Sequence, residues 1–156
     1  MPPIADPILN YRMETLKIPC CTRTPEMTRE IDALRQGKQG YLEKAQIACY
    51  EAWDDNTKIM DVPVQCLRIG DVALVGLPAE IFTAIGLEIK RLSPSGRTLI
   101  VEEANAQASI YVPTMDQAHR GGYGERPIQS RWLVAEAANL MIDAAIRMLH
   151  DIWNEK

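Results

Sequence analysis

Several features that are common in enzymes are missing from this sequence. Only two histidines occur, His119 and His150, so no pair of histidines has the spacing of a metal site. The sequence also contains neither a G-x-S-x-G nucleophile motif nor a glycine-rich loop that could cradle a phosphate. These absences exclude the usual serine-hydrolase and nucleotide-binding patterns, and they leave any metal site incomplete within these 156 residues.

Charge and hydrophobic length exclude two classes of partner. The net charge is -4 and the pI is near 5.2, with acidic and basic residues mixed along the chain, so no basic face for nucleic acid is predicted. No apolar run approaches ~18 residues, and no transmembrane segment is predicted. Residues 1–10 hold three prolines and no basic segment, which predicts a loose lead-in and not a secretory signal. The cellular compartment stays unassigned.

The four cysteines show no metal or redox spacing. They stand at Cys20, Cys21, Cys49 and Cys66, without any C-x-x-C pair. Free cysteine is among the most buried residue types. We therefore predict buried or half-buried free thiols.

The first third of the chain predicts an edge strand followed by a helical hairpin. Residues 11–19 alternate as in a strand. Thr24 and Pro25 are typical of a helix start, and Gly37 of its end. A second helix, over about 39–54, carries an apolar stripe that should face a core, formed by Leu42, Ala45, Cys49 and Trp53.

The remaining sequence predicts a sheet with two more helices, within a single domain over residues 1–156. Strands over 62–69 and 72–77 flank a tight Gly70-Asp71 turn, and the second strand is apolar enough to be internal. A helix over 79–92, a strand over 98–101 and a long helix over about 131–153 follow. The predicted class is α/β, with α+β as the alternative: a mixed β-sheet packed by the hairpin, the mid-chain helix and the C-terminal helix.

Glu80 and Tyr111 are the candidate site residues, each with two interpretations. Glu80 follows a buried strand in the predicted first turn of a helix, whose dipole would favour a carboxylate able to bind a metal or act as a base. It could equally be a simple helix cap. Tyr111 offers a phenolic oxygen, or is a half-buried aromatic. Asn105 and Ser109 precede it and could bind polar substrate groups or form turns.

The order and spacing of VALVGLPAEIFTAIGLEIKR, SIYVPT and GGYGE resemble the neutral/alkaline (non-lysosomal) ceramidase family, from about residue 11 onward. Its members are zinc amidohydrolases that cleave ceramide, and two histidines, a glutamate and a tyrosine hold the zinc. The glutamate motif P-G-E matches Pro78-Ala79-Glu80, and the tyrosine motif G-Y-V-x-T matches residues 110–114. The resemblance implies that Glu80 and Tyr111 are zinc ligands, that Tyr111 also acts in catalysis, and that the segment with Asn105 and Ser109 contacts substrate.

This sequence departs from the family pattern in three ways. Ala79 replaces a glycine, and the loop from Asn105 to Tyr111 is one residue longer than the common form. The family's zinc histidines and proposed catalytic serine come from an earlier region that these residues do not match, and His119 and His150 do not occupy matching positions. We therefore expect the C-terminal part of such a catalytic domain, inactive alone.

The resemblance also implies partners. The substrate would be an N-acyl lipid or another amide, and members are often secreted or membrane-associated. We expect a homo-oligomer, or association with the missing N-terminal part, because truncation would expose apolar surface. The alternative function is a non-catalytic α/β binding or assembly domain that kept only the scaffold.

Overall fold

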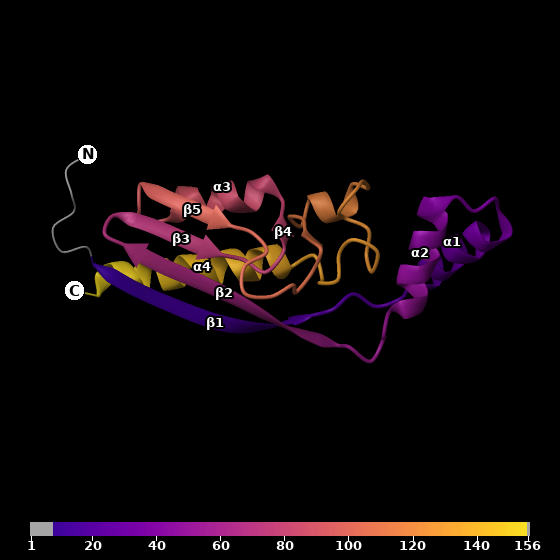
Figure 1. Ribbon diagram of the computed structural model, residues 1–156, viewed down its shortest axis with the longest axis horizontal. Helices are drawn as coiled ribbons and strands as arrows, with labels where there is room; N and C mark the ends of the chain where they lie inside the picture. Colours follow the sequence, from indigo (N-terminus) through magenta and orange to yellow (C-terminus); the bar gives the residue numbers. More distant parts are fainter. Residues whose placement is uncertain (1–7, 156) are drawn as a thin grey trace.

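A mixed sheet of four strands forms the centre of the structure, a computed structural model that describes residues 8–155 (Figure 1). The strand order is β1-β2-β3-β5, and β4 and β6 form a separate parallel pair. The strands span Leu9–Pro19 (β1), Ile59–Ile69 (β2), Val72–Gly76 (β3), Glu80–Ile81 (β4), Arg97–Val101 (β5) and Tyr111–Val112 (β6); the helices span Pro25–Gln36 (α1), Tyr41–Ala52 (α2), Thr83–Leu92 (α3) and Ala137–Asn154 (α4). The predicted α/β class is confirmed.

A tight turn and a helical crossover determine the order of the strands. β2 and β3 form an antiparallel hairpin through Gly70, whose φ of 61° is a backbone conformation that glycine adopts without strain. β3 then pairs in parallel with β5, and α3 makes the crossover between them. β3 is therefore internal and β1 lies at an edge, as the sequence predicts.

One face of the sheet, which we call the inner face, carries the hydrophobic core. α4 packs across β1 and β2, and α3 packs against α4 and β5. Figure 1 shows α4 running behind the sheet along its length. The core is contributed by fully buried side chains from these elements, among them Val62, Val64, Val75, Ile85, Ile89, Met141, Leu149 and Ile152. No helix within residues 8–155 has the length and apolarity that crossing a bilayer requires.

The predicted helical hairpin exists, but it does not pack on the sheet. α1 and α2 project beyond the sheet at the end where β1 finishes and β2 begins (Figure 1). In these two helices only Ile31 is buried. The stripe predicted to face a core is largely uncovered, since Leu42 is 69% exposed and Cys49 is exposed too. Of the predicted stripe only Trp53, just after α2, packs against the core. The prediction was wrong for Leu42 and Cys49, because periodicity shows a stripe and cannot show what covers it.

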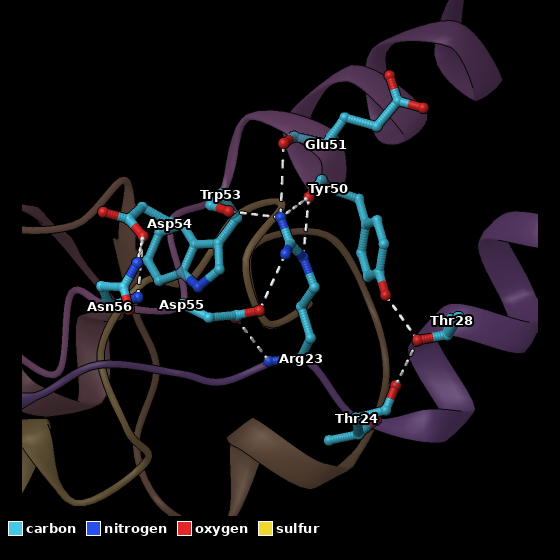
Figure 2. A network of polar contacts seen from close by, with 9 residues as sticks. All are labelled: Arg23, Thr24, Thr28, Tyr50, Glu51, Trp53, Asp54, Asp55 and Asn56. Carbon is cyan, nitrogen blue, oxygen red and sulfur yellow. Dashed lines mark hydrogen bonds and ion pairs between the residues drawn. The ribbon is translucent and has the colours of Figure 1, made fainter.

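Arg23 joins the hairpin to the rest of the molecule at its base (Figure 2). Its guanidinium donates to the carbonyl oxygens of Tyr50, at 2.7 Å, and Trp53, which are left without helical partners at the end of α2. It also pairs with Asp55 at 2.9 Å and lies 4.9 Å from the centre of the Tyr50 ring. The Tyr50 hydroxyl in turn lies 2.6 Å from that of Thr28 on α1. The Arg23 guanidinium thus holds the end of α2 to the segments that connect the hairpin with β1 and β2. The Tyr50–Thr28 contact joins α1 to α2.

Two helices begin later than the sequence predicts. α3 starts at Thr83, not Ala79, so Glu80 lies in strand β4 and not in the first turn of a helix. α4 starts at Ala137, because the residues before it extend along the end of β1, where Val134 donates to the Pro19 carbonyl. Of the lead-in predicted over residues 1–10, residues 1–7 lie outside the described part and Leu9 already belongs to β1.

Candidate functional site

Glu80 and Tyr111 lie side by side at the end of the sheet. They are partners in the parallel β4–β6 pair. Residues directly opposite each other in neighbouring strands point to the same face. The carboxylate and the phenol therefore project together, while their neighbours Ile81 and Val112 are buried in the core. The two residues that the sequence predicts to converge are brought together, by strand pairing and not by a helix start.

Backbone hydrogen bonds on both sides hold this short segment extended. The amides of Glu80 and Phe82 donate to Ile110 and Val112, at 2.9 and 3.0 Å. On the other side, residues after β5 bond to the same segment, with Ala104 donating to Leu77 at 2.9 Å. Since both edges are paired, the chain cannot turn into the helix until after Phe82. The hydrogen bonds to its two neighbouring segments, and not intrinsic helix propensity, therefore determine the conformation of Glu80.

The electrostatic environment of Tyr111 reflects this pairing. Partial burial, the carboxylate of Glu80 and the phenol of Tyr123 together raise the pKa of Tyr111 to about 12. A negative charge beside a phenol opposes its ionisation, as does loss of water. The phenol consequently keeps its proton at neutral pH and can donate a hydrogen bond.

Aromatic rings surround the phenol. Phe82 meets the Tyr111 ring edge-on at 6.4 Å, and Tyr123 does so at 5.6 Å. Gly124 permits this packing, because a Cβ there would stand 3.1 Å from Cγ of Tyr111 and its φ is 90°. The glycines around Tyr123 therefore serve the site by letting the loop approach Tyr111.

Asn105 and Ser109 occupy different environments. Asn105 is exposed, with a positive φ of 69°, and its amide lies over Gly76 at the end of β3. Ser109 is fully buried; its hydroxyl donates to the Tyr111 carbonyl at 2.8 Å and accepts from the Trp132 amide at 3.0 Å. Ser109 thus positions the backbone of Tyr111. A direct contact between either residue and a substrate stays a prediction.

Sequence reasoning missed the acidic character around Glu80. Burial, then the charges of Glu80 and Glu103, raise the pKa of Glu102, which follows β5 directly. The signal was present in the sequence, since parallel strands bring their carboxyl ends to one edge of a sheet. Glu80 ends the segment after β3 and Glu102 follows β5, the parallel neighbour of β3. The site is therefore a negatively charged edge beside the phenols of Tyr111 and Tyr123.

These residues do not by themselves fit a zinc ion. Structural and catalytic zinc sites use three or four protein ligands, mostly nitrogen and sulfur. Across residues 8–155, no cluster of three histidine, cysteine or acidic side chains could hold a metal. His119 is exposed in a 3₁₀ turn and His150 is exposed on α4. Glu80 and Tyr111 supply only two oxygen donors.

An apolar cavity of about 350 Å³ lies elsewhere, at the base of the hairpin. Its lining includes Trp53, Trp132 and Ile110. Ile110 precedes Tyr111, and successive residues of an extended chain point to opposite sides. The cavity and the phenol are therefore on opposite sides of this segment, and the cavity is not part of the Glu80–Tyr111 site.

Comparison with known proteins shows similarity at the level of fold. No protein-family model and no curated protein sequence matches the chain. Among solved structures, the neutral ceramidase from Pseudomonas aeruginosa is similar with a TM-score of 0.55 and 20% identity over 91% of this chain. A ceramidase complexed with C2 is similar with a TM-score of 0.57 and 16% identity, also over 91%. The chain spans only 28% and 30% of those two chains, so it shares the fold of part of each.

Proposed function

We propose that this chain forms one part of a zinc-dependent amide hydrolase centre of the ceramidase type, with Glu80 and Tyr111 as its two oxygen ligands. The pairing of these residues in the β4–β6 register supports the proposal most directly. The similarity to part of two ceramidase folds is consistent with it. The substrate class would be an N-acyl lipid such as ceramide, or another amide.

The chain alone is expected to be inactive. Its two oxygen donors fall short of the three or four ligands that zinc takes in proteins. In this proposal, imidazole ligands come from polypeptide outside these residues, and Tyr111 would face the reacting amide. Ceramide turnover by the isolated chain, lost on Glu80→Gln substitution, would contradict the expectation of inactivity.

The proposed ligand pair has a measurable electrostatic signature. The Glu80 carboxylate raises the pKa of Tyr111, so removing that charge should lower it from about 12 toward the ordinary 10.0. A cation bound between the two oxygens should lower it as well, since it favours the phenolate. Both changes require the carboxylate and the phenol to share one small space.

The experiment is a titration of ¹³C-labelled tyrosine followed by NMR. Tyr111→Phe assigns the Tyr111 signal among the five tyrosines. Glu80→Gln should lower the pKa of Tyr111, whereas the control Glu103→Gln, on the nearby loop, should leave it unchanged. Zinc in excess should shift the Tyr111 signal in the wild type more than in Glu80→Gln. Equal responses in all variants would contradict the ligand assignment.

A non-catalytic binding or assembly domain is the second candidate function. The observation that favours it is the lack, within residues 8–155, of a three-ligand cluster that could hold a metal. Under this alternative, zinc leaves the Tyr111 signal unchanged even when Glu80 governs its pKa. The two arms of the titration therefore separate a paired site that binds a cation from a paired scaffold that does not.

A further inference from the structure

The sheet has a second face, opposite α4, that no helix or strand within residues 8–155 covers. We call it the outer face. Six of its large apolar side chains are more than two-fifths exposed: Leu9 (74%), Tyr11 (63%), Met13 (51%), Ile69 (42%), Leu99 (55%) and Val101 (43%). In Figure 1 no helix lies in front of the sheet on this side. A sheet with one solvated face normally carries polar residues there, so this face is unusual.

The strand register makes these side chains contiguous. Tyr11 pairs with Leu67, Leu67 with Leu74 and Leu74 with Leu99, which forms one apolar row across all four strands. The adjacent row runs from Leu9 through Ile69 and Val72 to Arg97. The result is a patch and not scattered single residues. Exposed contiguous apolar patches mark interaction surfaces.

The outer face, including its Lys17–Asp61 end, offers one continuous area to a partner. The strands lie about 4.8 Å apart and rise about 3.3 Å per residue. Five residues of all four strands are in register, and β1 and β2 extend to 11 residues, so the planar area is roughly 500 Å². Roughly 320 Å² of this lies under the four strands that carry the apolar rows, and side chains standing on the plane add accessible area to it; a standard interface buries ~800 Å² per partner.

The charges on the outer face identify the kind of partner. Lys17 is paired with Asp61 across β1 and β2. At the opposite end of the sheet, Arg97 is paired with Asp71 at 2.8 Å. Each end thus carries one base and one acid, so two copies can meet without net repulsion. This balance also gives no basic rim of the kind that draws a protein to an anionic lipid surface.

We propose that two copies of this chain pack outer face against outer face to form a closed dimer. Each copy would supply one sheet of a sandwich, with strands of the two sheets aligned within about 30°. The two-fold arrangement places the Tyr11–Leu99 row of one copy on that of the other. α4 would then lie on the outside of the dimer. This proposal does not depend on Glu80 or Tyr111.

The test is the oligomeric state, by sedimentation velocity across the micromolar range. The wild type should be a dimer. Leu99→Glu should raise the dimer dissociation constant at least about 100-fold, because it buries an unpaired carboxylate in the interface. Tyr11→Glu, on the edge strand, should act in the same direction and covers the case in which Leu99→Glu fails to fold. Leu87→Glu, on α3 and 60% exposed, is the matched control and should leave the dimer intact.

Three results would overturn the proposal. These are a wild type that is monomeric at the highest concentration, a dimer that survives both outer-face variants, or one that Leu87→Glu disrupts equally. Phosphatidylcholine vesicles that bind the wild-type monomer through the same face would identify lipid as the occupant instead. The Glu80→Gln variant should still form the dimer, which shows that dimer formation does not depend on the proposed metal site.

Discussion

The sheet with α3 and α4 and the projecting hairpin of α1 and α2 are stabilised in different ways. The sheet and its two helices enclose a continuous core in which Val75, Ile85 and Leu149 are fully buried. The hairpin buries only Ile31 among its own residues and depends on Arg23 at its base. Both regions contain regular helices, and the better N-terminal caps are in the hairpin, at Thr24 and Gly40, since α3 and α4 have no side-chain cap bond. A regular helix therefore indicates nothing about how much packing supports it.

This difference predicts a difference in local stability. Regions with few buried apolar contacts open at lower free energy than the core, and they do so as units. The hairpin should open without the sheet, whereas the sheet cannot unfold and leave the hairpin intact. Substitutions in the core should therefore have larger and more widespread effects than substitutions in the hairpin.

Removing a core side chain should destabilise the whole molecule. Leu149→Ala deletes a side chain that is fully buried between α4 and the sheet, and such changes cost about 2–5 kcal/mol. The midpoint of urea unfolding should fall to a lower urea concentration, for both regions together. The control is Leu140→Ala on the same helix, where the side chain is 42% exposed and the cost should be small. Equal costs for the two variants would mean that α4 does not dock as described.

Removing Arg23 should loosen the hairpin and spare the sheet. Arg23→Ala leaves the carbonyls of Tyr50 and Trp53 without their donor, at a cost of about 1–3 kcal/mol. Hydrogen exchange should accelerate in α1 and α2 and stay unchanged in α4. Arg29→Ala, exposed on α1, is the matched control. If exchange accelerated equally in α4, the two regions would be one cooperative unit.

The smallest effect is expected at the start of α1. Thr24 accepts a hydrogen bond from the Met27 amide at 3.2 Å. Thr24→Ala should lower helix stability by about 1 kcal/mol, seen as faster exchange in the first turn of α1 alone. Thr22→Ala, exposed on the same connector, should have no such effect. A change that spread to β1 would show that the cap supports more than its own helix.

Local signals predicted the elements with their own turn or cap chemistry. Gly70 fixed the β2–β3 hairpin and Thr24 with Pro25 fixed the start of α1. Positions decided by distant partners were not predictable. Glu80 lies in a strand because Tyr111, 31 positions later, pairs with it, whereas propensity alone favoured a helix. The prediction that the apolar stripe of α2 faces a core failed for the same reason, because it depended on a partner elsewhere in the molecule.

The candidate site was predictable only in part. The motif resemblance selected Glu80 and Tyr111, which the structure pairs. It did not indicate Glu102, whose approach depends on the parallel pairing of β3 with β5. Nor could it indicate that Ser109 would be buried beneath Tyr111, because that burial follows from its bond to Trp132, 23 residues away.

The β4–β6 pair is only two residues long, so a ligand bound to its side chains should contribute measurably to the stability of the fold. Such a short ladder is held by few bonds of its own. A ligand that binds the side chains of both strands cross-links the segment after β3 to the loop between β5 and α4. By mass action, such a ligand stabilises the folded state by RT ln(1 + L/Kd), where L is the free ligand concentration, and raises the melting temperature as its concentration increases, so thermal shift can serve as a screen for small molecules at this site.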